Sequence, residues 1–202
     1  MGGGFAYSDD TSSTAVKPPG HPLVNKCFFK GNTGGAYFQS DDGAKIKNCV
    51  FVDNTSFGSS GIEVSYSKVK ISNCTFYNND PGKSIDDNPT AVIDCWASNF
   101  PEHVILENSI VTWGVQGAPV SWGSGCVIDV SYCNIFGNKE GDWVGELSGM
   151  LGNNGNISED PKFKDKAADD FSLSDDSPCK DKGNPDSPKD PDDTRADMGA
   201  FL

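Results

Sequence analysis

The sequence predicts an all-β fold, a right-handed parallel β-helix (solenoid) of about five coils that ends in a C-terminal capping tail. The first observation is a recurring unit in which a small residue is followed two positions later by an apolar residue and five positions later by Asn or Gly. Its copies are NKCFFKGN (25–32), KNCVFVDN (47–54), SNCTFYNN (72–79), ENSIVTWG (107–114) and SYCNIFGN (131–138). The second observation is a content of 23 Gly with a hydrophobic fraction of 36%, typical of a turn-rich chain of short strands.

The distance between copies indicates the size of one coil. The small residues are Cys27, Cys49, Cys74, Ser109 and Cys133, which are 22, 25, 35 and 24 residues apart. A step of this length holds three short strands and their turns, as in the coil of a parallel β-helix. We expect the extra residues of the 35-residue step to loop out of the coil.

The first two strands of each coil are predicted from two apolar columns. One column lies three positions before the small residue, and the other lies two positions after it. Their members are Val24, Ile46, Ile71, Leu106 and Val130, and Phe29, Phe51, Phe76, Val111 and Ile135. Both columns point into the solenoid and stack from coil to coil. The first column lies an odd number of positions, three, before the inward small residue, so one straight strand cannot point both inward. A bend is therefore required at Asn48, Asn73 and Asn108, where Asn accepts the left-handed conformation and can form a hydrogen bond with the equivalent Asn one coil away.

A second asparagine column marks the turn before the third strand. It contains Asn32, Asn54, Asn79 and Asn138, and Gly114 interrupts it. The third strand reads GGAYFQ (34–39), SGIEVS (60–65), PTAVID (89–94) and GAPVSW (117–122). With Ala36, Ile62, Ala91 and Ala118 aligned as inward residues, the outward columns are Tyr37, Glu63, Val92 and Pro119, and Gln39, Ser65, Asp94 and Ser121. Each column then offers a single carboxylate, whereas a glycoside hydrolase needs two.

Residues 157–202 differ in composition from the coils at 1–156, and we predict a boundary between them. The last segment is rich in Asp, Lys and Pro, as disordered acidic linkers are. It also contains interleaved apolar residues, namely Phe163, Phe171, Leu173, Met198 and Phe201. We therefore expect an ordered cap that covers the last coil, because an open solenoid end exposes apolar ladders and unpaired strand edges.

Four segments of the tail resemble the C-terminal ending of secreted bacterial right-handed β-helix repeat proteins of the pectate-lyase-like superfamily. They are DPKF (160–163), DFSL (170–173), SPCKDKGNP (177–185) and DPDDTRADMGAF (190–201). Together with the coils, the resemblance covers nearly the whole chain and implies the fold and export from the cell. It does not imply one function, since the superfamily spans lyases, hydrolases and adhesins. Asp193 stands where Gly is usual, and Lys180 where an apolar residue is usual.

The beginning of the chain predicts an uncovered coil. Met1 is followed at once by GGGFAY (2–7), an incomplete copy of the third strand, with no export signal before it. We expect a chain cut from a longer protein that is extracellular or displayed at the cell surface. Another protein would cover the open coil, or end-to-end self-association would do so by strand addition.

The seven Cys have two interpretations in an exported protein. Disulfides are the usual one. In the column of Cys27, Cys49, Cys74 and Cys133, however, parallel side chains point the same way and bridge poorly, so we favour reduced structural thiols. Cys95, Cys126 and Cys179 are less constrained, and one pair of them could bridge.

The net charge and the metal-ligating residues limit which partners and cofactors we expect. A net charge of −13 disfavours nucleic acid and anionic membranes, and no stretch is long and apolar enough for membrane insertion. The spacing of Asp190, Asp192, Asp193 and Asp197 could hold Ca²⁺, although the resemblance makes these residues part of the cap first. His21 and His103 fall in predicted loops and are too far apart in the sequence to suggest a zinc site. We expect no cofactor other than calcium.

The catalytic candidates are weak. Lys45 and Lys70 would be neighbours in an outward column of the first strand, with Asp129 two coils further on. A polysaccharide lyase would use such a basic residue to abstract a proton, beside acidic residues that bind calcium. Solvent-exposed lysines that prevent pairing with strands of other chains explain these two residues better. We therefore favour a protein that is not an enzyme. If the chain is one, a polysaccharide lyase is the expected type.

The outward face of the second strand is too apolar for open solvent. Its columns are Phe28, Val50, Thr75, Ile110 and Asn134, and Lys30, Val52, Tyr77, Thr112 and Phe136. A loop or the tail packed over this face is the favoured interpretation, and a binding surface is the other. Loop residues that could extend such a surface for a polysaccharide or a protein are Tyr66, Trp96, Trp113, Trp122 and Trp143.

Two classes of function remain. The first is a non-catalytic secreted or cell-surface β-helix module that acts as a scaffold or a carbohydrate-binding surface. The second is a polysaccharide lyase or glycoside hydrolase whose cleft lies partly in missing N-terminal coils. We choose the first, because no outward column brings two acids together. The irregular fourth copy, around Ser109, is the first place where we expect a site.

Overall fold

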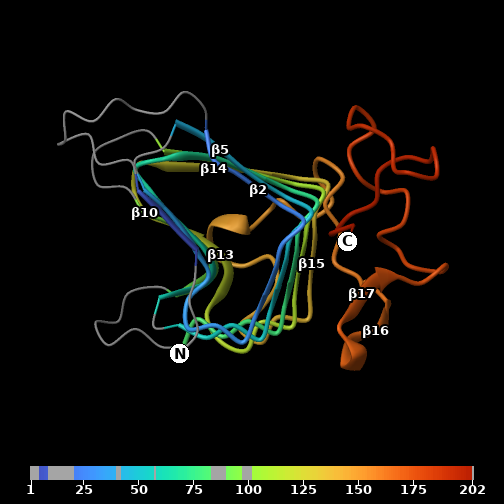
Figure 1. Ribbon diagram of the computed structural model, residues 1–202, viewed down its shortest axis with the longest axis horizontal. Coiled ribbons are helices and arrows are strands. Elements are labelled where there is room, and N and C mark those ends of the chain that lie inside the picture. Colours follow the sequence, from blue (N-terminus) through green and yellow to red (C-terminus); the bar gives the residue numbers. More distant parts are fainter. Residues whose placement is uncertain are drawn as a thin grey trace.

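The computed structural model describes residues 5–8, 21–39, 42–56, 58–82, 90–96 and 102–201. In this part of the chain, three five-stranded parallel sheets surround a common interior. Figure 1 looks along the solenoid, so that the strands of successive coils overlie one another as three sides of a triangle. The predicted all-β parallel solenoid is confirmed.

Each sheet takes one strand from each coil. Sheet A contains β1 (Phe5–Ser8), β4 (Ala36–Gln39), β7 (Ser59–Ser65), β10 (Ala91–Trp96) and β13 (Ala118–Trp122). Sheet B contains β2 (Leu23–Asn25), β5 (Asp42–Lys47), β8 (Lys68–Ser72), β11 (Glu102–Glu107) and β14 (Cys126–Ser131). Sheet C contains β3 (Phe28–Lys30), β6 (Val50–Val52), β9 (Thr75–Tyr77), β12 (Ile110–Thr112) and β15 (Asn134–Phe136). Outside the sheets lie η1 (Gly145–Leu147), the antiparallel hairpin β16 (Phe163–Asp165) and β17 (Asp170–Leu173), and η2 (Lys166–Ala168).

The interior is built from the predicted apolar columns. Phe29, Phe51 and Phe76 stack with ring centroids 4.6 and 4.8 Å apart and nearly parallel planes. Ile46, Ile71 and Leu106 of sheet B are fully buried. Because equivalent residues of successive coils lie about one strand spacing apart, a repeated apolar residue fills the interior without gaps.

Both asparagine columns form the predicted turns. Asn48, Asn73 and Asn108 are left-handed, with φ of 50, 50 and 49°. In the second column, the Asn54 amide donates to Asn79 Oδ1 at 3.0 Å. Gly114 interrupts this ladder without breaking it, because its backbone N–H donates to Asn138 Oδ1 at 2.9 Å.

The pairing of β10 corrects the predicted register of the third strand. We aligned Ala91 with Ile62, but in the structure Ile93 pairs with Ile62 after an irregularity in the strand. The reason is packing, since the shift places a larger side chain in the buried column. As a result, Glu63 and Asp94 become neighbours on the outward face of sheet A.

The segment after β15 closes the last coil. Leu147 of η1 is fully buried in the solenoid core, and Trp143 and Met150 pack against that core. The tail after Ile157 lies along the outward side of sheet C instead (Figure 1). The tail is ordered, but its expected place over the last coil is corrected. Leu147 already fills the end of the solenoid at the last coil, and the apolar residues of the tail pack against the outward side chains of sheet C.

None of the seven cysteines forms a disulfide in the structure. The thiols of Cys49 and Cys133 donate to the carbonyl oxygens two residues earlier, at 3.0 and 3.2 Å. Ser109 repeats this bond from its hydroxyl to Glu107 O at 2.9 Å. The column therefore satisfies backbone acceptors at the bend between sheets B and C, which explains why Ser can replace Cys there.

Candidate functional site

The tail buries the apolar outward face of sheet C. The cluster between them contains Val50, Val52 and Ile110 of the sheet and Phe163, Phe171, Cys179 and Met198 of the tail. The tail backbone is also bonded to the coils, since Gly199 N–H donates to Asn108 O at 2.8 Å. The expectation that the tail packs over this face is confirmed, and Phe28 at its first coil remains 40% exposed.

Tyr77 and Trp113, two of the aromatic candidates, meet under the tail. Their ring centroids are 5.5 Å apart. Lys166 Nζ lies 4.1 Å from the centroid of the Trp113 ring, and the Phe171 ring lies 5.2 Å from that of Tyr77. The aromatic faces that a sugar ring would stack on are therefore occupied by the chain itself.

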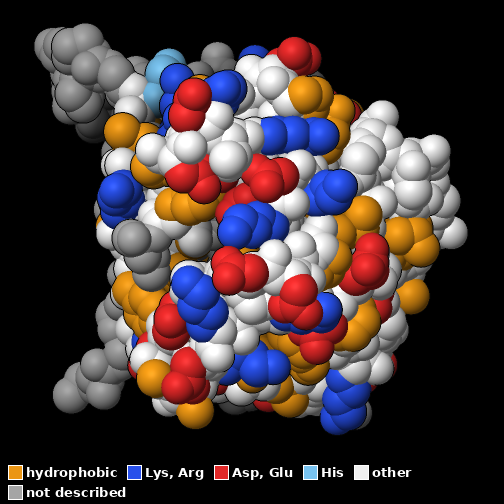
Figure 2. Space-filling view, turned by 90° about the vertical axis from the view of Figure 1, so that its right-hand side faces the viewer, with side chains coloured by type: hydrophobic (Ala, Val, Ile, Leu, Met, Phe, Trp, Pro, Cys, Tyr) orange, Lys and Arg blue, Asp and Glu red, His pale blue; other side chains and the backbone are white. Residues whose placement is uncertain are grey.

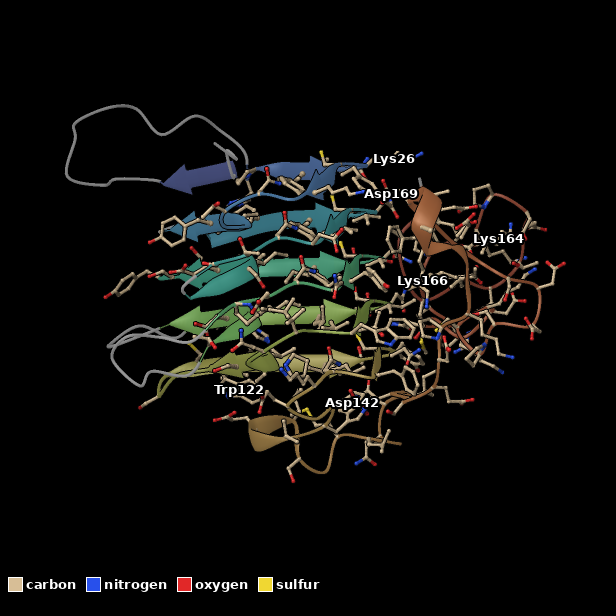
Figure 3. The ribbon with its side chains drawn as sticks, turned by 90° about the horizontal axis from the view of Figure 1, so that it is seen from below. Lys26, Trp122, Asp142, Lys164, Lys166 and Asp169 are labelled. Carbon is tan, nitrogen blue, oxygen red and sulfur yellow. The ribbon has the colours of Figure 1, made fainter. Side chains whose placement is uncertain are left out.

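The other aromatic candidates are dispersed. Tyr66 is 40% exposed at the turn between β7 and β8. Trp122 is partly buried against the solenoid core, and Figure 3 shows it at the last coils, away from Lys166. Trp96 ends β10, and its side chain lies outside the described residues. Among the side chains that the structure describes, Tyr66 and Trp122 therefore do not join Tyr77 and Trp113 in one surface.

A groove of about 320 Å³ lies where the outward face of sheet B meets the tail. We call it the lysine groove. Its lining consists of Lys45, Lys47, Lys70, Ser72, Asn73 and Glu107 from the coils and Asn184, Asp186, Ser187 and Pro188 from the tail. Figure 2 shows both charges interspersed over the face that the tail forms.

Two of the predicted catalytic residues lie together in this groove. The register pairs Lys45 with Lys70, as predicted. Lys70 Nζ lies 2.8 Å from Glu107 Oε2, and the Asn184 amide donates to Glu107 Oε1 at 2.8 Å. Burial raises the pKa of Glu107, but the hydrogen bonds from Lys70 and Asn184 outweigh it and hold the pKa below its ordinary value. Glu107 is therefore ionised at neutral pH and holds Lys70 in place.

Lys45 and Lys47 are exposed, and neither forms an ion pair with any residue that the structure describes. Ser72 is only 4% exposed, and its hydroxyl has no hydrogen-bond partner among the described atoms. A buried hydroxyl without a partner costs free energy, so a ligand that bonds it would be stabilised. The groove thus combines two unpaired cations with an unsatisfied hydroxyl group.

Asp129 does not belong to the groove. Its carboxylate lies 2.7 Å from His103 Nε2, on the same outward face but outside the groove lining. His103 itself lies in β11 and not in a loop, which corrects the sequence-based placement. The predicted column is confirmed, since Lys45 pairs with Lys70, Lys70 with Ile105 and Ile105 with Asp129, which places Asp129 two coils beyond Lys70.

The corrected register creates a pair of carboxylates on sheet A. Glu63 and Asp94 lie on adjacent coils, in a column that continues to Tyr37 and Ser121. Asp94 is only 3% exposed, and burial raises the pKa of Glu63. Two acids one strand spacing apart, one of which holds its proton more tightly, are the groups that glycoside hydrolysis requires.

The four tail aspartates make their contacts within the tail, three of them with backbone N–H groups and the fourth with a lysine side chain. Asp190 and Asp197 accept the backbone N–H groups of Asp197 and Asp181 at 2.8 and 2.6 Å. Asp192 accepts from Thr194, and Asp193 pairs with Lys189. Within the described ranges, no group of three or more His, Cys, Asp or Glu is placed to hold a metal ion. No helix in these ranges is long and apolar enough to span a membrane.

Some features of the two sites were missed for identifiable reasons. Ser72 and Glu107 lie in one column of sheet B with Lys47, but nothing in that column indicates that residues 184–188 would pack beside it. The Glu63–Asp94 pair was missed because the third strand was aligned on Ala91. The alternation of Ile93 and Cys95, which matches that of Ile62 and Val64, was the available signal.

The comparisons with known proteins agree with this architecture. The family model described as a right-handed β-helix region matches residues 7–157. No curated protein and no solved structure matches the chain. Because the matched segment contains every strand from β2 to β15 and spans well over half of the sequence, this chain belongs to the right-handed β-helix family.

Proposed function

We propose that this protein is a non-catalytic, secreted or cell-surface β-helix module that binds a polysaccharide in the lysine groove. The observation that carries the proposal is the pair of unpaired lysines, Lys45 and Lys47, beside the buried and unsatisfied hydroxyl of Ser72. Its volume of about 320 Å³ lies at the lower end of the range of about 300–1,000 Å³ that small-ligand sites occupy. It is lined by hydrogen-bonding groups that suit a sugar hydroxyl or carboxylate.

The net charge of the protein indicates that an acidic polysaccharide would bind through local contacts with the groove lysines and not through attraction to the whole surface. The chain carries a net charge of −13, so it repels an acidic polymer except where lysines gather. In the groove, Lys70 is held by Glu107, while Lys45 and Lys47 are available to a carboxylate or sulfate group. We therefore expect acidic polysaccharides to bind more tightly than neutral ones.

Calorimetric titration with polygalacturonate, alginate and a neutral glucan tests this function. The double substitution Lys45→Ala with Lys47→Ala should weaken binding of the acidic polymers by about 10- to 30-fold, since each lost charge-assisted contact is worth about 1 kcal/mol at an exposed site. Lys139→Ala with Lys182→Ala, two exposed lysines outside the groove, is the matched control. Equal losses in both double variants would show that binding does not use the groove.

A glycoside hydrolase is the second candidate, and the Glu63–Asp94 pair favours it. Adjacent strands lie about 4.8 Å apart, close to the carboxylate separation of retaining enzymes. Glu63 would donate the proton and Asp94 would act as the nucleophile. A reducing-sugar assay on the same polymers checks this, with Glu63→Gln and Asp94→Asn as variants that remove the activity. Ultraviolet detection of unsaturated products, with and without Ca²⁺, tests a lyase in parallel.

Two further expectations belong to this proposal. We place the protein outside the cell, where calcium binding by Asp190, Asp192, Asp193 and Asp197 can be tested by titration with Ca²⁺. We also place self-association at the first coil, because β2 and β3 are edge strands of sheets B and C among the strands described. Light scattering at increasing protein concentration would detect end-to-end association, and a constant mass would exclude it.

A further inference from the structure

Three thiols lie on three consecutive coils at the start of the solenoid. The register pairs Phe28 with Val50 and Val50 with Thr75, so the residues just before them, Cys27, Cys49 and Cys74, form one column. Ser109 occupies the fourth position and separates these thiols from Cys133. The first three cysteines are therefore a discrete cluster.

The members of this cluster differ in their surroundings. Cys27 is partly exposed, whereas Cys49 and Cys74 are fully buried. A hydrogen bond from the Cys74 thiol lowers the pKa of Cys49 to about 7, against the effect of burial. Burial raises the pKa of both Cys27 and Cys74. Of the three thiols, Cys49 is therefore the one that loses its proton most readily near neutral pH.

The distance between neighbouring coils is compatible with a bond between Cys27 and Cys49. Parallel strands lie about 4.8 Å apart, within the range of Cα separations of about 4.4–6.8 Å that disulfides span. The two side chains point the same way, so one of them must rotate. Cys27 is the one able to do so, because it precedes β3, which pairs with β6 alone among the described strands.

We propose that Cys27 and Cys49 are a redox-sensitive thiol pair, a modification site at which a hydroperoxide closes a disulfide between the first two coils. In the first step, the Cys27 thiolate attacks the peroxide oxygen, forms a sulfenic acid and releases hydroxide or alkoxide. In the second step, the Cys49 thiolate attacks the sulfur of that sulfenic acid and displaces hydroxide. The two thiols lose two electrons in total, and the O–O bond of the peroxide accepts them.

The two steps differ in speed. The first step is slow, because the raised pKa of Cys27 keeps its thiol protonated. The second step is fast, because the Cys49 thiolate lies on the next coil. A sulfenic acid at Cys27 therefore does not accumulate unless Cys49 is absent. The parallel side chains strain the resulting disulfide, so a mild dithiol reverses it.

Peptide mapping after peroxide treatment of the native, fully reduced chain tests the proposal. Trypsin places Cys27, Cys49 and Cys74 on separate peptides, 27–30, 48–68 and 71–83. We expect a disulfide between the first two peptides and an intact mass lower by two hydrogen atoms. Both changes should disappear on treatment with dithiothreitol. A disulfide between peptides 48–68 and 71–83, or no disulfide at all, would overturn the proposal.

Two substitutions complete the test. Cys49→Ser should fold, because Ser109 already makes the same hydrogen bond in the fourth coil. It should abolish the disulfide and leave Cys27 as a sulfenic acid that dimedone traps. Cys133→Ser is the matched control from the same column, and it should form the disulfide at the wild-type rate. If Cys49→Ser still loses two hydrogen atoms, or if Cys133→Ser does not, the proposed pair is wrong.

Discussion

Sheets B and C share one solenoid geometry but present opposite outward faces. Sheet C is apolar outside, and the tail covers it with Phe163, Phe171 and Met198. Sheet B carries lysines outside, and residues 184–188 of the tail border it at the edge of the lysine groove. The same repeated strand can therefore support either a buried interface or an open polar groove, and the outward residues of each column decide which.

This difference indicates separate roles for the two faces. The covered face stabilises the chain, since it buries apolar area that would otherwise meet water. The groove keeps exposed cations and an unsatisfied hydroxyl, which cost stability and suit a ligand. Substitutions on the sheet C side should therefore change the free energy of unfolding, and substitutions in the groove should change affinity.

The largest effect is expected from Phe171→Ala. Phe171 is 4% exposed and contacts the rings of Phe28, Tyr77 and Phe163. Its loss should lower the free energy of unfolding by about 3–4 kcal/mol, because a cavity is left between tail and sheet. Urea unfolding measures it. Leu151→Ala, at a residue that is 50% exposed, is the control, and equal effects of the two would show that the tail does not stabilise the coils.

A smaller loss is expected from Gly199→Ala, which tests how closely the tail approaches sheet C. A Cβ at Gly199 would lie 2.9 Å from Ile110 Cδ1 and 3.1 Å from Thr75 Oγ1. Gly149 has a similar positive φ, 84° against 98°, but open space around it. The difference in unfolding free energy between Gly199→Ala and Gly149→Ala isolates the contact and should be about 1–3 kcal/mol. No difference would mean that the tail sits further from the sheet.

In the groove, Glu107→Gln should change affinity more than stability. The substitution removes the charge that holds Lys70 but keeps an oxygen for the Asn184 amide. Lys70 then becomes available to an anionic ligand, and binding of an acidic polysaccharide should tighten about three- to tenfold. Glu146→Gln, at an exposed residue outside the groove, should leave calorimetric affinity unchanged. Weaker binding by Glu107→Gln would reverse the role assigned to Glu107.

The smallest effect is a pH dependence in the tail. Burial raises the pKa of Asp190 to about 6, above the value near 4 of an unfolded chain. The folded state therefore holds this proton more tightly, and the resulting stabilisation is complete below pH of about 4 and is lost as the pH rises through about 6. Asp190→Asn should accordingly gain stability relative to the wild type between pH 4 and 7. Urea unfolding of both proteins at pH 4 and pH 7 checks this, and a difference between them that does not change with pH would contradict it.

Local patterns were sufficient to predict the coils. The spacing of Cys49, Phe51 and Asn54 within one copy specifies a strand, a bend and a turn, and stacking simply repeats them. The left-handed Asn48 and Asn73 and the stacked Phe ladder follow from the same rules. The Lys45–Lys70 pairing was also predictable, because neighbours in a column are set by the repeat itself.

The sequence alone therefore established the coil and its columns, since these depend on residues within one repeat and on the identical repeat above it. Only the tertiary structure decided the position of the tail, the neighbours of Glu107 and the shift that joins Glu63 to Asp94. The contact between Glu107 and Asn184 spans 77 residues of chain, and no periodic pattern encodes such a separation. The register of β10 depends on whether Ala91 or Ile93 packs better opposite Ile62 in the interior, and this packing exists only in the folded structure.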